Sequence, residues 1–193
     1  MTKKEEIAAQ EQMIKQLPKE AQEKIEKIKT KLDEFQKRVL DKFGKYITGI
    51  GLLPPERAQE GKPVDTNKIN VLVLVDDTDS MKMSKTELRD KLFSIVDKIA
   101  QDIDKNLIPQ VVIYSELWQS CYDAKYDLIG LVSLAAPVYD QGMLAAVKIA
   151  EIHKSMVLKK FEKYIVSYVL SWSLVRGEAT ATSDIDVFIV IDD

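Results

Sequence analysis

The chain has 193 residues, which is enough for one ordinary domain with a helical extension or for two small domains. Its net charge of −3 gives no electrostatic reason to expect a nucleic-acid-binding surface along the whole chain. Cys121 is the only cysteine, which excludes a disulfide framework and a zinc site built from several thiolates. The sequence begins without a signal-peptide pattern and has no apolar run long enough to span a bilayer, so we expect a cytoplasmic protein with no membrane partner.

A long helix is expected after Pro18, a residue that suits a first helical turn. In residues 21–43, apolar side chains recur at intervals of four and three, the spacing of a heptad seam. The seam consists of Ile25, Ile28, Leu32, Phe35 and Val39. Two interpretations stay open: the charged run is the solvated side of a helix, or residues 21–43 pair with a coiled-coil partner or with a second copy.

The middle of the chain alternates strand and helix signals. Residues 52–68 contain several Pro and Gly and predict a loop, and the apolar β-branched run 69–75 predicts a strand buried on both faces. Ser84 and Glu87 form a capping-box pattern before an amphipathic helix that reaches Ile103. The remaining predicted elements are a strand at 111–114, a helical stretch 115–130 interrupted near Asp123, a turn bracketed by Pro137 and Gly142, and one helix from Met143 to about Leu170. These elements predict an α/β protein with a small mixed sheet and flanking helices, preceded by a long N-terminal helix.

The sequence contains an internal repeat. Residues 39–47 match residues 157–165 at seven of nine positions, and residues 66–77 align with residues 182–193 in the same order. The offset between the copies falls from 118 to 116, so the loop of the first copy is two residues longer. A duplication explains the shared order and spacing better than convergence of two apolar patterns. A strand at 186–191 with nothing after it would leave its buried faces unmatched, so we expect a fragment or a chain that a partner completes.

The chemistry-bearing residues lie in the second copy, between residues 171 and 191. This segment resembles the nucleotidyltransferase superfamily of the DNA polymerase β type, whose signature is Gly-Ser, a loop often containing Arg-Gly-Glu-Ala, and Ser-Asp-x-Asp before an apolar strand. The resemblance is specific over this segment, looser over residues 157–193, and extends to residues 39–150 only through the repeat. The matching residues are Ser173, Arg176, Gly177, Glu178, Ala179, Ser183, Asp184 and Asp186.

Asp184 and Asp186 are the candidate metal ligands and catalytic residues. Residues two apart on a strand project from the same face, about 6.5 Å apart along it, so both carboxylates can converge on one site. Two Mg²⁺ ions held there could stabilise the attacking and leaving oxygens of a phosphoryl transfer. The resemblance implies that a third carboxylate on a later strand completes the site. It also implies that Ser173, Arg176, Gly177 and Ser183 contact the phosphates of a nucleoside triphosphate.

Two departures from the family pattern bear on function. Trp172 replaces the glycine that precedes the family serine, which puts a bulky ring where the backbone usually approaches the phosphates. In the first copy, Lys68 and Asn70 replace Asp184 and Asp186, and Pro54-Pro55 replaces Trp172-Ser173. The first copy therefore lacks the carboxylates of the site.

These observations divide the chain into a charged helical or coiled-coil extension (1–38), a degenerate nucleotidyltransferase-like domain (39–150) and the start of a second such domain (151–193). The expected function is transfer of a nucleoside monophosphate from a nucleoside triphosphate to an acceptor, which in this superfamily is an RNA, a protein or a small molecule. The alternative is a non-catalytic scaffold or interaction module. A nucleic-acid adaptor is disfavoured because the sequence shows no basic stretch interleaved with aromatic residues.

Overall fold

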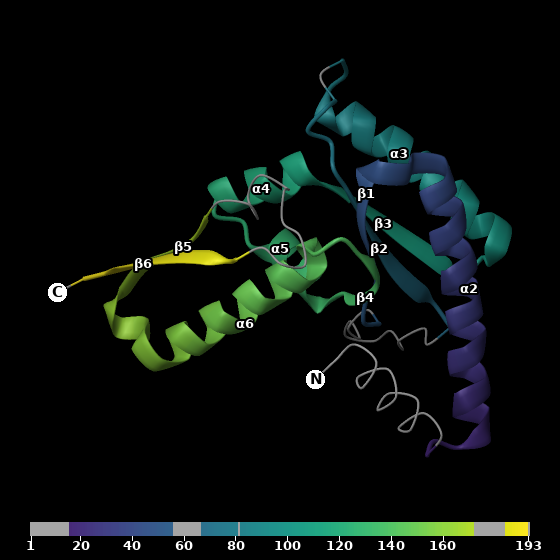
Figure 1. Cartoon of the computed structure of the whole chain (residues 1–193), viewed down its shortest axis with the longest axis horizontal. Coiled ribbons are helices and arrows are strands. Elements are labelled where there is room, and N and C mark those ends of the chain that lie inside the picture. The colour runs from purple at the N-terminus through teal and green to yellow at the C-terminus, as the bar shows by residue number, and fades with distance from the viewer. Residues whose placement is uncertain (1–15, 56–66, 81, 172–183, 193) are drawn as a thin grey trace, which may run out of the picture.

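The computed structural model describes residues 16–55, 67–80, 82–171 and 184–192 of the chain. Within these ranges the chain forms five α-helices, a four-stranded mixed sheet and a separate two-stranded sheet. A long helix opens the described part of the chain (Figure 1). The predicted mixed α/β architecture with a long N-terminal helix is confirmed at this level.

The helices are α2 (Lys19–Phe43), α3 (Lys85–Ile103), α4 (Tyr114–Tyr122), α5 (Asp127–Leu134) and α6 (Met143–Phe161). The strands are β1 (Ile47–Leu52), β2 (Ile69–Val75), β3 (Leu107–Ile113), β4 (Ala136–Asp140), β5 (Ile165–Ser171) and β6 (Asp186–Ile191). Short 3₁₀ turns, η1 (Gly44–Tyr46) and η2 (Glu162–Tyr164), join α2 to β1 and α6 to β5.

The four-stranded sheet has the order β3-β2-β1-β4. β1 is antiparallel to both β2 and β4, whereas β2 and β3 are parallel and are connected through α3. The two edge strands contain Pro109 and Pro137, which fits the confinement of proline to strands that need not donate a hydrogen bond on both sides.

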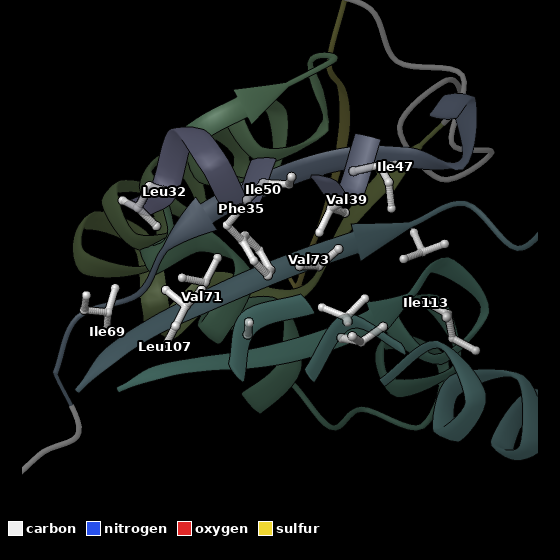
Figure 2. Packing of buried hydrophobic residues seen from close by; sticks show 14 residues of the cluster. Leu32, Phe35, Val39, Ile47, Ile50, Ile69, Val71, Val73, Leu107 and Ile113 are labelled. Atoms are coloured by element: carbon white, nitrogen blue, oxygen red, sulfur yellow. The ribbon is translucent and has the colours of Figure 1, made fainter. Parts of the chain in front are cut away.

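One face of this sheet is covered by α2 and α3. The heptad seam of α2 supplies Leu32, Phe35 and Val39 to a buried cluster, and Figure 2 shows Phe35 pointing toward Val73 of β2. The covering of one sheet face by an amphipathic helix accounts for the heptad spacing, since such a helix places every third or fourth residue on its apolar side. The seam from Leu32 to Val39 is therefore occupied by this chain's own sheet. A coiled-coil partner or self-association through 21–43 stays a prediction, with Ile25 and the partly buried Ile28 nearest the uncovered end.

The opposite face of the sheet is covered by α4, α5 and α6. Leu72 and Leu74 of β2 lie in a second buried cluster on this side, together with Val147 of α6 and Leu117 of α4. Every residue of β2 is buried, so the prediction of a strand covered on both faces is confirmed.

Several predicted element boundaries agree with the structure. Ser84 accepts a hydrogen bond from the backbone N–H of Glu87 at 3.2 Å, which is the predicted N-cap of α3. α4 and α5 are separated after Tyr122, where Ala124 adopts a positive φ of 56° and breaks the helix near Asp123.

Other boundaries were predicted wrongly. The helix expected to reach Leu170 ends at Phe161, and β5 follows, because Ile165, Val166 and Val169 are β-branched residues that favour a strand. Pro137 lies in β4 rather than in a turn, and β3 begins at Leu107 instead of residue 111. β1 carried no strand prediction.

The segments that match in sequence also match in structure. We call α2, η1, β1 and β2 the first unit, and α6, η2, β5 and β6 the second unit. Both are a helix, a 3₁₀ turn and an antiparallel strand pair. Adding 118 to the residue numbers of β1 and 116 to those of β2 gives the register of β5 with β6. For example, Ile47 opposite Val75 corresponds to Ile165 opposite Ile191.

The correspondence extends to an irregularity and to single hydrogen bonds. Each first strand has a register shift just after its first residue, between Ile47 and Gly49 in one unit and between Ile165 and Ser167 in the other. After the second strand, Asp76 donates its backbone N–H to the carbonyl oxygen of Tyr46 at 2.8 Å. Asp192 does the same to Tyr164 at 2.9 Å.

The two units differ in what surrounds them. The first unit forms half of the four-stranded sheet, whereas β5 and β6 form a separate hairpin on the side of the molecule away from α2 (Figure 1). α6 connects the two, because its first half packs against the four-stranded sheet and its second half leads into β5. One helix therefore serves both as cover for the first sheet and as the start of the second unit.

Candidate active site

The acidic pair lies at the start of β6. Asp186 is the first residue of this strand and is paired with Ser171, the last residue of β5, while Asp184 lies two residues before it. Both carboxylates are exposed to solvent. Alternation along β6 puts Asp186 on the same side of the hairpin as Phe188 and Val190.

This side of the hairpin is open. Phe188 and Val190 are 56% and 49% exposed, although they continue the face that begins with Asp186. On its outer edge, β6 has no strand partner within the described residues. The acidic pair thus lies at the end of an apolar surface that a substrate or a further structural element could contact.

The corresponding side of the first unit is filled. Asn70 occupies the position of Asp186 and is only 4% exposed, and Leu72 and Leu74, which correspond to Phe188 and Val190, lie in the second buried cluster. Among the residues that the structure describes, the side-chain oxygen Oδ1 of Asn70 has no hydrogen-bond partner. Lys68, which corresponds to Asp184, is exposed.

Two glycines of β1 allow other elements to pack closely against this side of the first unit. A Cβ at Gly49 would lie 2.8 Å from Leu144 Cγ, and a Cβ at Gly51 would lie 2.8 Å from the Cβ of Ala135. The glycines therefore let α6 and the end of α5 approach β1 closely. The second unit has Ser167 and Val169 at these positions, side chains that such close packing would not accept.

The other predicted site residues, Ser173, Arg176, Gly177 and Ser183, lie outside the described residues, as does Trp172. The structure thus places the two carboxylates and leaves the predicted phosphate contacts untested. No group of three or more His, Cys, Asp or Glu side chains in the described ranges is close enough to hold a metal ion.

The aspartates after β2 have structural roles. Asp76 Oδ1 accepts hydrogen bonds from the backbone N–H and the hydroxyl of Thr78, at 2.9 and 2.7 Å. Asp77 accepts from the backbone N–H of Ser115 at 2.9 Å and from its hydroxyl, which ties the end of β2 to the first turn of α4. These bonds stabilise the turn that follows β2. Asp193 lies outside the described residues.

A cavity that the sequence did not predict lies between α4 and α5 on one side and α6 and β5 of the second unit on the other. Its volume is about 270 Å³, and α4, α6 and β5 contribute most of its walls, including Trp118, Lys154 and Tyr168. Burial raises the pKa of Tyr168, as does the nearby carboxylate of Glu151. Burial also raises the pKa of the Cys121 thiol, which lines the same cavity. No local sequence signal marks these residues, because they come from separate elements.

His153 has a partner on this side of the molecule. Its Nδ1 lies 2.8 Å from the Tyr168 hydroxyl, and the two rings are 5.9 Å apart between centroids. The side chain is exposed, and within the described part of the chain it is bonded at one nitrogen only. His153 corresponds to Phe35, the buried centre of the first unit's seam.

Comparisons with protein-family models, with curated proteins and with solved structures found no match. No helix in the described part of the chain combines the length and the apolar character needed to cross a bilayer.

Proposed function

We propose that the second unit is the metal-binding part of a magnesium-dependent nucleotidyltransferase. The observation that carries this proposal is the register shared by the two units, with Asp186 at the position of Asn70 and Asp184 at that of Lys68. The same backbone arrangement forms with and without the carboxylates, so the fold does not need them. We attribute these two exposed aspartates, which the fold does not need, to metal binding and catalysis.

The proposed reaction uses the acidic pair as ligands of Mg²⁺. An acceptor oxygen attacks the α-phosphorus of a nucleoside triphosphate, a new oxygen–phosphorus bond forms, and the bond to the β-phosphate bridging oxygen breaks to release pyrophosphate. Two ions bound near Asp184 and Asp186 would stabilise the negative charge on the attacking and leaving oxygens. Ser173, Arg176, Gly177 and Ser183 are the proposed phosphate contacts.

The proposal requires a third carboxylate beside β6. In the first unit, β2 is flanked on its outer edge by the parallel strand β3, with Val73 opposite Val111 and Leu74 opposite Val112. A strand placed in the same way against β6 would bring a side chain to the open side of the hairpin, near Asp186. We therefore propose that the complete site contains such a strand and that its acidic residue is the third ligand.

The first unit is proposed to be a degenerate copy with a structural role. On the corresponding side of its strand pair, Leu72 and Leu74 pack with α6 in the second buried cluster, and Asn70 is buried. α6 and the end of α5 approach β1 closely at Gly49 and Gly51, which supports a structural role for this side of the first unit. We propose that both units arose by duplication and that only the second retained chemistry.

The test measures metal binding and transfer separately. The purified chain is titrated with Mn²⁺, a spectroscopic substitute for Mg²⁺, and binding is followed by electron paramagnetic resonance. It is then incubated with Mg²⁺ and each of the four nucleoside triphosphates labelled at the α-phosphate, and labelled products and pyrophosphate are measured. We expect Asp184→Asn and Asp186→Asn to lose Mn²⁺ binding and any transfer activity.

Asp192→Asn is the matched control, because Asp192 is exposed on the same hairpin but lies at its other end, next to Ile191. This variant is expected to behave as the unaltered chain. Equal Mn²⁺ binding and equal transfer in the unaltered chain and in both site variants would refute the metal role of the pair.

The second candidate is a non-catalytic scaffold, which the bulky Trp172 beside Ser173 favours. In this case calorimetry with Mg²⁺ and each nucleoside triphosphate would show no binding. Reintroducing the family residue by Trp172→Gly distinguishes the two, since binding gained by this variant would identify the ring as the obstacle in an otherwise intact site.

A further inference from the structure

A groove runs between the end of α5 and α6. Its volume is about 430 Å³, and its floor is apolar. The floor residues are Leu134 at the end of α5 and Ile152 and Met156 on α6, with exposed fractions of 58%, 53% and 65%. Ile152 and Met156 are one turn apart, so together with Leu134 they form a short stripe that solvent can reach.

The first unit shows that this position on the helix needs no apolar residue. With the offset of 118, Ile152 corresponds to Glu34 and Met156 to Arg38. These two side chains are exposed and form an ion pair along α2, with 2.5 Å between Arg38 Nη2 and Glu34 Oε1. The same helix face is thus charged and solvated in one copy and apolar in the other, although it is not part of the core in either.

The rim of the groove is basic. Lys148 and Lys159 both line it, and neither has an acidic partner within salt-bridge distance among the residues that the structure describes. The one acidic residue of the groove, Glu151, is paired with Lys154 at 2.6 Å. An apolar floor between unpaired positive charges fits a ligand with an apolar stripe and negative flanks.

We propose that this groove binds an acidic amphipathic helix of a partner protein. Apolar residues of the helix at i, i+3 or i+4, and i+7 would contact Leu134, Ile152 and Met156, and flanking Glu or Asp side chains would pair with Lys148 and Lys159. A second copy of this chain fits less well. If two grooves faced each other, Lys148 and Lys159 of one copy would lie opposite the same lysines of the other and repel them. A flat anionic membrane fits less well because the floor lies between two helices.

The test uses a designed probe and variants of the full chain. The probe is a fluorescein-labelled, lactam-stapled helical peptide of about 18 residues, with Leu along one stripe and Glu on both flanks, since shorter unconstrained helices are marginal in water. Fluorescence anisotropy measures its binding. The paired substitution Ile152→Glu and Met156→Arg transplants the Glu34–Arg38 pair into α6, so it should preserve the fold while weakening binding at least tenfold.

Two further variants separate charge from apolar contact. Lys148→Glu with Lys159→Glu should also weaken binding at least tenfold, and added salt should weaken binding to the unaltered chain several-fold. Phe93→Glu, on α3 and outside the groove, removes another exposed apolar side chain and should change nothing. Circular dichroism of every variant confirms that the helices are retained.

Each alternative occupant gives a distinct result that overturns the proposal. A peptide with Lys in place of Glu on its flanks should not bind, and equal affinity for it would show non-specific apolar adsorption. Concentration-dependent dimerisation that Ile152→Glu with Met156→Arg abolishes would assign the groove to a second copy. Binding to phosphatidylserine vesicles but not to the acidic peptide would assign it to a membrane surface.

Discussion

Asn70 and Asp186 occupy the same register position in two structurally equivalent strand pairs, yet Asn70 is buried in the four-stranded sheet and Asp186 is exposed at the start of the separate hairpin. The surroundings, rather than the strand, therefore decide which side chain each position accepts. A carboxylate at the position of Asn70 would have to be buried, whereas the carboxylate of Asp186 remains in contact with water. This difference leads to the first two predictions.

Asp184→Asn and Asp186→Asn should leave the stability of the chain almost unchanged. Both side chains are exposed, and substitutions at such positions usually alter the free energy of unfolding by no more than about 0.5 kcal/mol. Urea unfolding followed by circular dichroism measures this. A loss of several kcal/mol would mean that the carboxylates hold the hairpin together, which would remove the main support for a chemical role.

Asn70→Asp should destabilise the chain by about 3 kcal/mol or more, because it buries a charge without a partner. Asn70→Leu should be neutral or stabilising, because the buried Oδ1 of Asn70 has no hydrogen-bond partner in the described part of the chain. Unfolding midpoints of both variants in urea provide the comparison. If Asn70→Leu lowers the unfolding midpoint as much as Asn70→Asp does, the side-chain amide of Asn70 forms a stabilising hydrogen bond, and the prediction is wrong.

Gly51→Ala should cost about 1 to 3 kcal/mol of stability, since its Cβ would lie 2.8 Å from the Cβ of Ala135 and 3.2 Å from the carbonyl oxygen of Ala136. Gly130→Ala is the control. A Cβ at Gly130 has no heavy atom within 4 Å, and the residue lies within α5, so this change should stabilise the helix by about 0.5 to 1 kcal/mol. Thermal unfolding of the two variants should therefore shift in opposite directions.

Asp104 should make stability depend on pH in the acidic range. Its hydrogen bond with Lys31 lowers the pKa of this carboxyl, and the backbone N–H of Asn106 lowers it further. A folded-state pKa below the unfolded value, which is about 3.9, gives stability that is present above that value. This stability is lost as the pH falls through the folded-state pKa.

Asp104→Asn should consequently be less stable than the unaltered chain at pH 7, and the two should converge near pH 2. Urea titrations at a series of pH values test this. The contact joins α2 to the end of α3, so Lys31→Met should show the same convergence. A difference between Asp104→Asn and the unaltered chain that persists undiminished at low pH would assign the effect to packing instead of charge.

The sequence predicted those features that depend on near neighbours in the chain. The N-cap at Ser84, the buried strand β2 and the break after Tyr122 were predicted from residue type and spacing, and the structure contains each of them. The repeat did not correct the missing strands. Val157 to Ile165 matches Val39 to Ile47, but neither of the strands that follow these segments, β1 and β5, was predicted, so neither could reveal the other.

The sequence by itself determined the helix seam, the strand patterns, the repeat and the identity of the acidic pair, because each is written in residues a few positions apart. Only the tertiary structure decided what covers each surface: the sheet over Phe35, α6 over Leu72, and solvent over Asp186 and Ile152. The reason is that the elements that pack against a surface are distant from it in the chain. Two segments with the same local pattern can therefore have different packing partners, and the pattern does not indicate which.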